Sequence, residues 1–276
     1  MEIVYDQRAV PRLQMSIAPT TRKLKVLHPR WQAGFPEATW LPVEPVEAPL
    51  MCRAHDPAYV EGLLSGRIPN GLGASDTDWL RWKIGALVTA ARRAHQNRSC
   101  VGALVGGYHH ASYSSAWGFC TLNGLAIAAI DRLDAGAARV GILDIDYHPA
   151  DGTQDIIRRL GLGSRVPLYS FGDQEIERAN IERWLALLPR IVEGFAKDGC
   201  ELLLYYSAAD PHVDDPLGGS MTTEQLARRD AIVFRTCRRL GLPVAWCLGG
   251  GYQEPLENTL VIHDNTLRAA IEAYRP

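Results

Sequence analysis

Asp146 and His148 are a pair whose types and spacing suggest chemistry. Residues two apart in an extended segment point to the same side, so this carboxylate and this imidazole can reach one ion. Asp210, which follows a later apolar segment, supplies a third donor. Two carboxylates and one imidazole with an open position are typical of a catalytic zinc site, and the same donors accept Fe(II). The structural alternative is a polar turn at Asp146 and His148, with Asp210 capping a helix.

Two adjacent histidines, His109 and His110, follow a pair of glycines. Imidazole is the natural proton carrier near neutral pH, so we predict acid–base chemistry here. Each ring needs a carboxylate that orients its far nitrogen, and Asp144 and Asp151 are the available candidates. The alternatives are packed or solvent-facing histidines and a buried Asp144 that only fixes its loop.

Tyr252 follows three consecutive glycines at 249–251. Glycine lets the backbone pass close to another group and adopt positive φ. We predict that the phenol lies over the metal and donates to a carbonyl oxygen as negative charge develops there. The alternative is a tight strand-to-helix turn with an exposed tyrosine.

The elements that must position these side chains alternate regularly from residue 100 onward. Near-continuous apolar segments alternate with amphipathic ones, which indicates a parallel sheet covered on both faces by helices. The expected strands are 100–105, 139–143, 166–170, 201–206 and 243–248. The expected helices are 122–133, 153–160, 176–196, 222–240 and 254–274. Ligands bind beyond the carboxyl ends of such strands, where all of these clusters fall. We therefore expect a single three-layer α/β/α domain over residues 1–276.

Residues 1–56 contain seven prolines, which interrupt any long element. We expect only two short strands in this part, at 23–27 and 39–43. Two helices should follow, one at 56–65 with Asp56 as its N-cap and one at 76–95.

Composition excludes several classes of protein. With 47% hydrophobic and 22% charged residues the chain is typical of a globular domain, and a net charge of −2 gives no basic excess for nucleic acid. Its apolar runs are strand-sized, whereas a membrane span needs about 20 residues. Six cysteines without CxxC spacing predict buried thiols in a reducing compartment. The N-terminus shows no signal-peptide pattern, so we expect a cytoplasmic protein without membrane or nucleic-acid partners.

Five motifs, in order along the chain, resemble the histone deacetylase family. That family includes acetylpolyamine amidohydrolases and other bacterial homologues on the arginase/deacetylase fold. The motifs are GYHHA at 107–111, GFCxxN at 118–123, LDIDYHxxDGT at 143–153, DxHxxDPLG at 210–218 and GGGYQ at 249–253. The likeness extends from about residue 55 to the end and looks closest to short bacterial and class IV-like members.

The resemblance implies an eight-stranded, mostly parallel sheet and a Zn²⁺-dependent hydrolase of linear amides. It assigns roles by position: zinc ligands Asp146, His148 and Asp210; a general base and acid His110, oriented by Asp151; electrostatic support from His109 with Asp144; and an oxyanion donor, Tyr252. It also implies a channel for the acyl-amine stem and a structural K⁺ ion. The implied channel residues are Gly118, Phe119, Tyr108, Leu217 and Gly250, and the implied K⁺ ligands are Asp144 and Ser170.

The implied substrate is an acyl-lysine or a related acylated amine. An acetylpolyamine or a small-metabolite amide is the alternative, and a catalytically silent binding module is a remote one. An arginase-like site with two manganese ions is discounted, because Tyr108-His109-His110 and the segment 207–210 lack the further ligands it needs. Oligomeric state stays open, including a homo-oligomer.

The sequence also departs from the family pattern. Ala209 precedes Asp210 in a run where the family usually has a glycine. No Phe-Pro-Gly loop occurs between Ser170 and Glu201, so one aromatic wall of the channel is expected to be missing and the entrance to be wider or shallower. The first 50 residues match poorly, which leaves the rim of the site unassigned.

Overall fold

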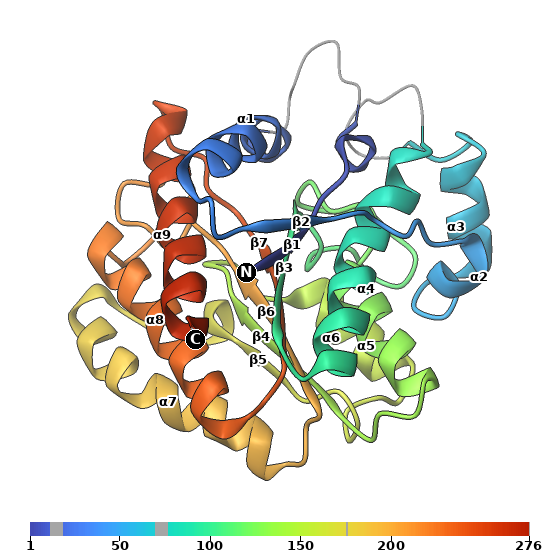
Figure 1. Cartoon of the computed structure of the whole chain (residues 1–276). Coiled ribbons are helices and arrows are strands. Elements are labelled where there is room, and N and C mark those ends of the chain that lie inside the picture. The colour runs from blue at the N-terminus through green and yellow to red at the C-terminus, as the bar shows by residue number, and fades with distance from the viewer. Residues whose placement is uncertain (12–18, 70–76, 175, 276) are drawn as a thin grey trace.

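The computed structural model of the chain describes residues 1–11, 19–69, 77–174 and 176–275. Within these residues, seven parallel strands form one sheet in the order β2-β1-β3-β7-β6-β4-β5 (Figure 1). The strands are β1 (Glu2–Val4), β2 (Thr39–Leu41), β3 (Cys100–Gly106), β4 (Val140–Ile145), β5 (Leu168–Ser170), β6 (Leu202–Ser207) and β7 (Val244–Leu248).

Helices cover both faces of this sheet (Figure 1). Their bounds are α1 (Pro19–Gly34), α2 (Ala48–Met51), α3 (Pro57–Leu64), α4 (Trp79–Asn97), α5 (Gly124–Asp134), α6 (Asp151–Arg159), α7 (Ile181–Lys197), α8 (Thr223–Leu240) and α9 (Leu256–Tyr274). On one side lie α2 to α6, and on the other lie α1, α7, α8 and α9.

Local sequence explains where several helices begin. The Asp56 side chain accepts a hydrogen bond from the Ala58 amide at the start of α3, as its predicted N-cap role requires. Thr222 and Gln225 form a reciprocal capping box at the start of α8. Both arrangements satisfy backbone N–H groups that the first turn of a helix leaves unpaired.

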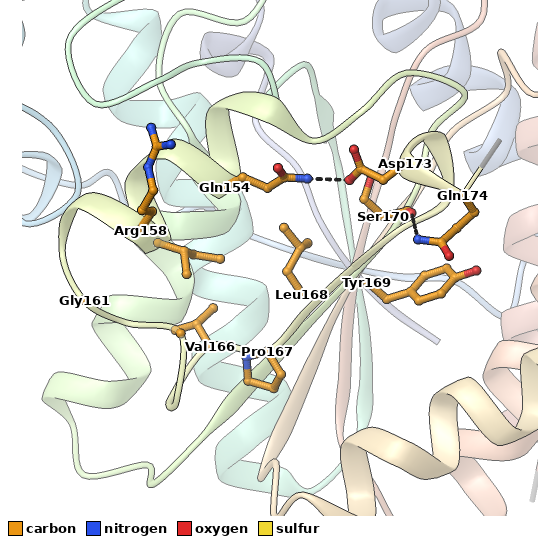
Figure 2. Close-up of a pocket in the computed structure, with 12 residues that line it drawn as sticks. Gln154, Arg158, Gly161, Val166, Pro167, Leu168, Tyr169, Ser170, Asp173 and Gln174 are labelled. Atoms are coloured by element: carbon orange, nitrogen blue, oxygen red, sulfur yellow. Dashed lines mark hydrogen bonds between the residues drawn. The ribbon is translucent and has the colours of Figure 1, made fainter.

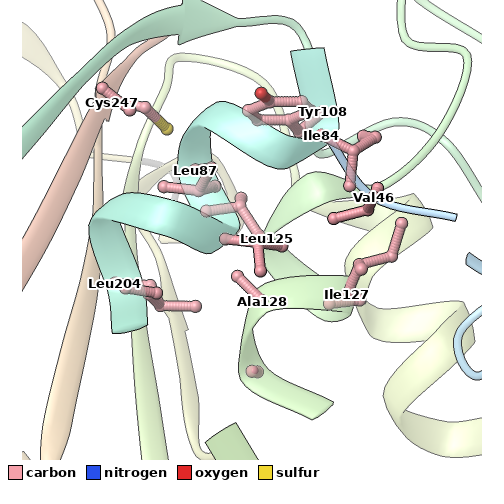
Figure 3. Close-up of a cluster of buried hydrophobic side chains, with 14 of the residues drawn as sticks. Val46, Ile84, Leu87, Tyr108, Leu125, Ile127, Ala128, Leu204 and Cys247 are labelled. Atoms are coloured by element: carbon pink, nitrogen blue, oxygen red, sulfur yellow. The ribbon is translucent and has the colours of Figure 1, made fainter. Parts of the chain in front are cut away.

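The core consists of two apolar clusters, one on each face of the sheet. Alternate residues of β6 divide between them: Leu202 and Leu204 face α4 and α5, while Leu203 faces the opposite helices. Figure 3 shows the first cluster, in which Leu87 of α4 and Leu125 of α5 pack beside Leu204. All residues of β4 and β6 are buried, which explains why their sequences are almost continuously apolar.

The predicted architecture is confirmed from residue 100 onward, with shifts of a few residues at the element ends. The sheet has seven strands in the described residues, whereas the resemblance implies eight. All six cysteines are free thiols; five are buried, as expected, and Cys52 is half-buried.

The strand expected at 23–27 is wrong, because this segment belongs to α1. Leu24, Leu27 and Trp31 recur at helical spacing and are all buried, so burial of one helical face decides the conformation. Pro29 lies inside the helix without ending it. The N-terminal strand β1 was not expected from the sequence. Its last two residues are fully buried.

Candidate metal centre and active site

Four neighbouring strands deliver the predicted residues to one edge of the sheet. Because β3, β7, β6 and β4 are adjacent and parallel, the loops after their carboxyl ends meet. The histidine pair follows β3, Asp146 and His148 follow β4, Asp210 follows β6, and Tyr252 follows β7.

The three predicted metal ligands come together. Nδ1 of His148 lies 3.0 Å from Oδ1 of Asp146 and 3.1 Å from Oδ2 of Asp210. One donor atom from each residue falls within 4.8 Å of the others, so a single ion can contact all three. This arrangement is the one that the sequence predicted from two separate loops.

The charges of this cluster favour a bound cation. Burial and the neighbouring charge of Asp146 raise the pKa of Asp210 to about 8. Hydrogen bonds to Asp146 and Asp210 raise the pKa of His148 to about 10. Protons on Asp210 and His148 therefore compensate the buried carboxylates at neutral pH, and a divalent cation can take their place. The donor set of two carboxylates and one imidazole fits zinc or Fe(II).

Gly250 packs directly behind the ligands. A Cβ atom at this position would lie 2.1 Å from Oδ2 of Asp210, so a larger residue would displace the carboxylate. The Gly250 amide donates to Oδ2 of Asp146 at 3.3 Å. Gly250 thus supports the predicted metal ligands and is not among the residues that line the cavity beside them, which corrects the expectation from the resemblance.

Lys23 holds the same glycine loop from the other side. This α1 residue is 1% exposed, and its ammonium donates to the carbonyl oxygens of Gly249 and Gly250. Burial lowers the pKa of Lys23 to about 8, partly offset by the charges of Asp210 and Asp146. Lys23 was not among the predicted site residues, because its segment was expected to form a strand.

The two histidines have the expected carboxylate partners but differ in environment. His109 Nδ1 lies 3.1 Å from Oδ2 of the fully buried Asp144, and His110 Nδ1 lies 2.6 Å from Oδ1 of the exposed Asp151. Burial alone lowers the pKa of His109, but the charges of Asp146 and Asp144 outweigh it and raise that pKa to about 9. Burial and the charge of His109 lower the pKa of His110. At neutral pH, His109 is therefore cationic and His110 neutral.

Tyr252 is anchored through its backbone by Asp215. The Tyr252 amide donates to Oδ2 of Asp215 at 2.8 Å, and Oδ1 of Asp215 accepts from the Leu217 amide at 3.0 Å. Burial raises the pKa of the Tyr252 phenol well above its usual value, so it remains a neutral hydrogen-bond donor. Asp215 was quoted in a sequence motif but given no role, and the motif itself was the signal that pointed to it.

His110, His148 and Tyr252 line a cavity of about 490 Å³. Its lining residues are His110, Ala116, Trp117, Gly118, Phe119, Cys120, His148, Leu217 and Tyr252. Three of the expected channel residues, Gly118, Phe119 and Leu217, are among these lining residues. Tyr108 is instead fully buried in the core beside Ile84 (Figure 3), which corrects its predicted place in the channel.

A tight turn presents Trp117 at the mouth of this cavity. Trp117 and Cys120 exchange backbone hydrogen bonds of 3.1 and 2.8 Å, and the two residues between them have φ of 53° and 62°. Positive φ at both central positions is the requirement of a type I′ turn. A Cβ on Gly118 would lie 2.3 Å from the His110 ring, so glycine is needed there. Trp117 is 69% exposed and was not singled out from the sequence.

The proposed cation ligands Asp144 and Ser170 are register partners on β4 and β5. Asp144 Oδ1 accepts from the Asp146 amide at 3.0 Å, and Ser170 Oγ accepts from the Ala150 amide at 3.1 Å. Their proximity is compatible with a shared ion, and the K⁺ site stays a prediction.

A second hollow, of about 570 Å³, follows the edge strand β5 (Figure 2). Of the residues predicted for the site, Ser170 lines it, together with polar side chains such as Gln154, Arg158 and Asp173.

Within the described parts of the chain, no helix is long and apolar enough to cross a membrane.

Known protein sequences are similar to this chain over part or most of its length. Residues 16–175 match the histone deacetylase domain family. The chain is 30% identical over 269 residues to an uncharacterized protein of Picosynechococcus sp., covering 88% of this chain and 85% of that protein. Over 48 residues it is 56% identical to acetylpolyamine amidohydrolase 2 of Pseudomonas aeruginosa, which is 17% of this chain and 14% of that enzyme.

Solved structures share the fold. The HDA15 HD domain superposes with a TM-score of 0.78 at 18% identity, covering 98% of this chain and 91% of that one. An acetylpolyamine aminohydrolase from Burkholderia pseudomallei gives a TM-score of 0.77 at 17% identity, covering 99% of both chains. The fold is therefore the expected arginase/deacetylase fold. Since the family match spans more than half of its length, the chain belongs to the histone deacetylase family.

Proposed function

We propose that this protein is a zinc-dependent amidohydrolase that removes an acetyl or longer acyl group from an acyl-lysine or a related acylated amine. One observation carries the proposal: the cluster of Asp146, His148 and Asp210 reaches, through His148, a cavity that His110 and Tyr252 also line. A metal-binding group, a proton acceptor and a neutral phenol are the parts that hydrolysis of an amide needs. In this proposal residues 1–276 form one catalytic domain.

Zinc, or alternatively Fe²⁺, would be held by Asp146, His148 and Asp210. When bound, such an ion lowers the pKa of water toward neutrality and polarises a carbonyl group. Gly250 and Lys23 support the ligand cluster from behind, through contacts with Asp146 and with the glycine-loop carbonyls.

His110 would move the proton. Its Nδ1 faces Asp151, which leaves Nε2 available to accept a proton from the attacking water and later to return it to the leaving amine. Its lowered pKa keeps the ring neutral and ready to accept at pH 7. His109 would remain protonated beside Asp144 and stabilise negative charge electrostatically.

Tyr252 would donate a hydrogen bond to the carbonyl oxygen of the substrate as negative charge builds up there. Its anchoring by Asp215 fixes the backbone before substrate binds, so little reorganisation accompanies the reaction. Gly118 and Phe119 would hold the amine stem, and Trp117 and Leu217, both exposed at the mouth, would contact what lies beyond it.

An acetylpolyamine is the alternative substrate. The short but high-identity match to a relative named acetylpolyamine amidohydrolase supports this class. A small, flexible amine also needs no extended rim. The monovalent cation at Asp144 and Ser170 is retained as a prediction of this proposal.

A substrate panel tests the function. Metal-free protein, reloaded with zinc, is assayed on a fluorogenic acetyl-lysine peptide, on longer-acyl versions of it, and on N-acetylputrescine. We expect zinc-dependent release of the acyl group from at least one of them and inhibition by a hydroxamate. Zinc-loaded protein that cleaves none of these amides would contradict the proposal.

A further inference from the structure

Helix α4 places a lysine inside the core beside the histidine loop. Lys83 is 5% exposed and lies on the same face of the helix as Leu80, Ile84 and Leu87, which are fully buried. Burying an ammonium group is costly unless its hydrogen bonds are satisfied. A lysine at such an apolar position therefore calls for a specific partner.

That partner is the loop after β3. Nζ of Lys83 donates to the Gly107 carbonyl at 2.8 Å and lies 5.1 Å from the centre of the Tyr108 ring. The Tyr108 hydroxyl donates back to the Lys83 carbonyl at 2.7 Å. Side chain and backbone of one helical residue are thus tied to two consecutive residues of the loop. In the described part of the chain, the recorded contacts of this ammonium are with neutral groups.

Gly107 and Tyr108, which are held by this clamp of two hydrogen bonds to Lys83, lie immediately before the histidine pair. Gly107 has φ of 79°, and its amide donates to the Tyr206 hydroxyl at 3.1 Å. Tyr206 in turn lies against the ring of His109, with centroids 5.2 Å apart. The direction in which the chain leaves Gly107 therefore sets where both imidazoles lie.

We propose that Lys83 is a positioning residue for His109 and His110, acting through the Gly107 carbonyl. Its role in turnover rests on the proposed function, whereas its role in holding the loop does not. Lys23 provides a parallel, because it holds the carbonyls of the other glycine loop, which leads to Tyr252. Burial lowers the pKa of Lys83 to about 8, which leaves it protonated and able to donate at neutral pH.

The test replaces Lys83 with methionine, which keeps an unbranched side chain as far as Cε and removes the ammonium. Val88→Ala is the matched control, because Val88 is fully buried further along α4 and its truncation destabilises the same helix without removing the clamp. We expect Lys83→Met to lower kcat about 10- to 100-fold, with KM within about twofold and zinc content unchanged. Val88→Ala should retain kcat.

A second readout does not depend on hydrolysis. In ¹⁵N-labelled, zinc-loaded protein at fixed pH, the imidazole resonances of His109 and His110 should shift in Lys83→Met and stay in place in Val88→Ala. If Lys83→Met does not fold, Tyr108→Phe removes the return hydrogen bond and should give the same changes at a smaller scale. If the wild type is inactive on every substrate, the proposed function fails and these resonances still test the clamp. Unchanged imidazole resonances, or wild-type kcat, in the folded variant would overturn the proposal.

Discussion

Two hollows of similar size lie on this molecule and differ in chemistry. The cavity at the carboxyl edge of the sheet measures about 490 Å³, and the hollow along β5 measures about 570 Å³ (Figure 2). In the β5 hollow, polar side chains satisfy one another: Gln154 donates to Asp173, and Gln174 donates to the Ser170 carbonyl at 3.1 Å. In the carboxyl-edge cavity, buried carboxylates and imidazoles shift one another's pKa values.

The comparison shows that volume does not identify a functional site. Burying charged groups costs free energy, so groups with strongly shifted pKa values cluster at sites that bind or react. Asp146 and Asp210 lie almost fully buried beside one another, an arrangement that a cation can compensate. In the β5 hollow, Asp173 accepts from Gln154 and Arg158 pairs with Asp155, so substitutions in the two hollows should have very different effects.

Among substitutions outside the metal cluster, the largest effect is expected for Tyr252→Phe. The variant loses the hydroxyl that stabilises the oxyanion, which typically lowers kcat about 10²- to 10³-fold. Steady-state kinetics and metal analysis on the same sample check this. Zinc content should be unchanged, because Tyr252 is not among the clustered ligands. Near-normal turnover would remove the tyrosine from the mechanism.

Asp151→Asn should have the next largest effect, about 10- to 100-fold on kcat, because the His110 ring loses its orienting carboxylate. It also changes the pH profile. Asp151 raises the pKa of His110, so its loss lowers that pKa further, and the acidic limb of kcat/KM should move to lower pH. An acidic limb that moves to higher pH would contradict the assignment of His110 as the base.

Trp117→Ala tests the mouth of the cavity. We expect KM to rise about three- to tenfold with kcat nearly unchanged, since in the proposed function the exposed indole would contact the substrate outside the channel. The ratio of the KM increases for an acetyl-lysine peptide and for N-acetylputrescine shows which substrate reaches it. Equal KM values in variant and wild type for both substrates would mean that Trp117 does not contribute to the choice of substrate.

The smallest effect is expected for Arg158→Ala, in the hollow along β5. The Arg158 side chain is 83% exposed and pairs with Asp155 on its own helix, so kcat/KM should stay within about twofold of wild type. The same assays serve as the measurement. A loss as large as that of Trp117→Ala would break the contrast between the two hollows.

Much of the site was predictable because parallel sheets bring the loops after their strands together. The pairing of Asp144 with His109 and of Asp151 with His110 follows from motifs of a few residues each. The general position of the cavity follows from the rule that ligands bind beyond the carboxyl ends of parallel strands. Such local patterns survive even when the bounds of an element are misjudged by a few residues.

The supporting residues were not predicted, because they come from elsewhere in the chain. Lys23 lies in a segment whose helical conformation depends on tertiary burial, and Tyr108 turns into the core although its neighbour His109 faces the site. Lys83 did leave a signal, a charged residue on an otherwise apolar helical face. Trp117 is exposed by a tight turn, and Gly118 was the only sequence signal for that turn.

We propose that one divalent ion, held by Asp146, His148 and Asp210, makes the cavity an active site. The most direct test of this proposal is a titration of metal-free protein with zinc while hydrolysis of the best substrate is followed. Activity should rise linearly and level off at one equivalent, and His148→Ala and Asp210→Asn should show no such rise. Full activity of the metal-free protein, or an unchanged titration in either variant, would contradict the account.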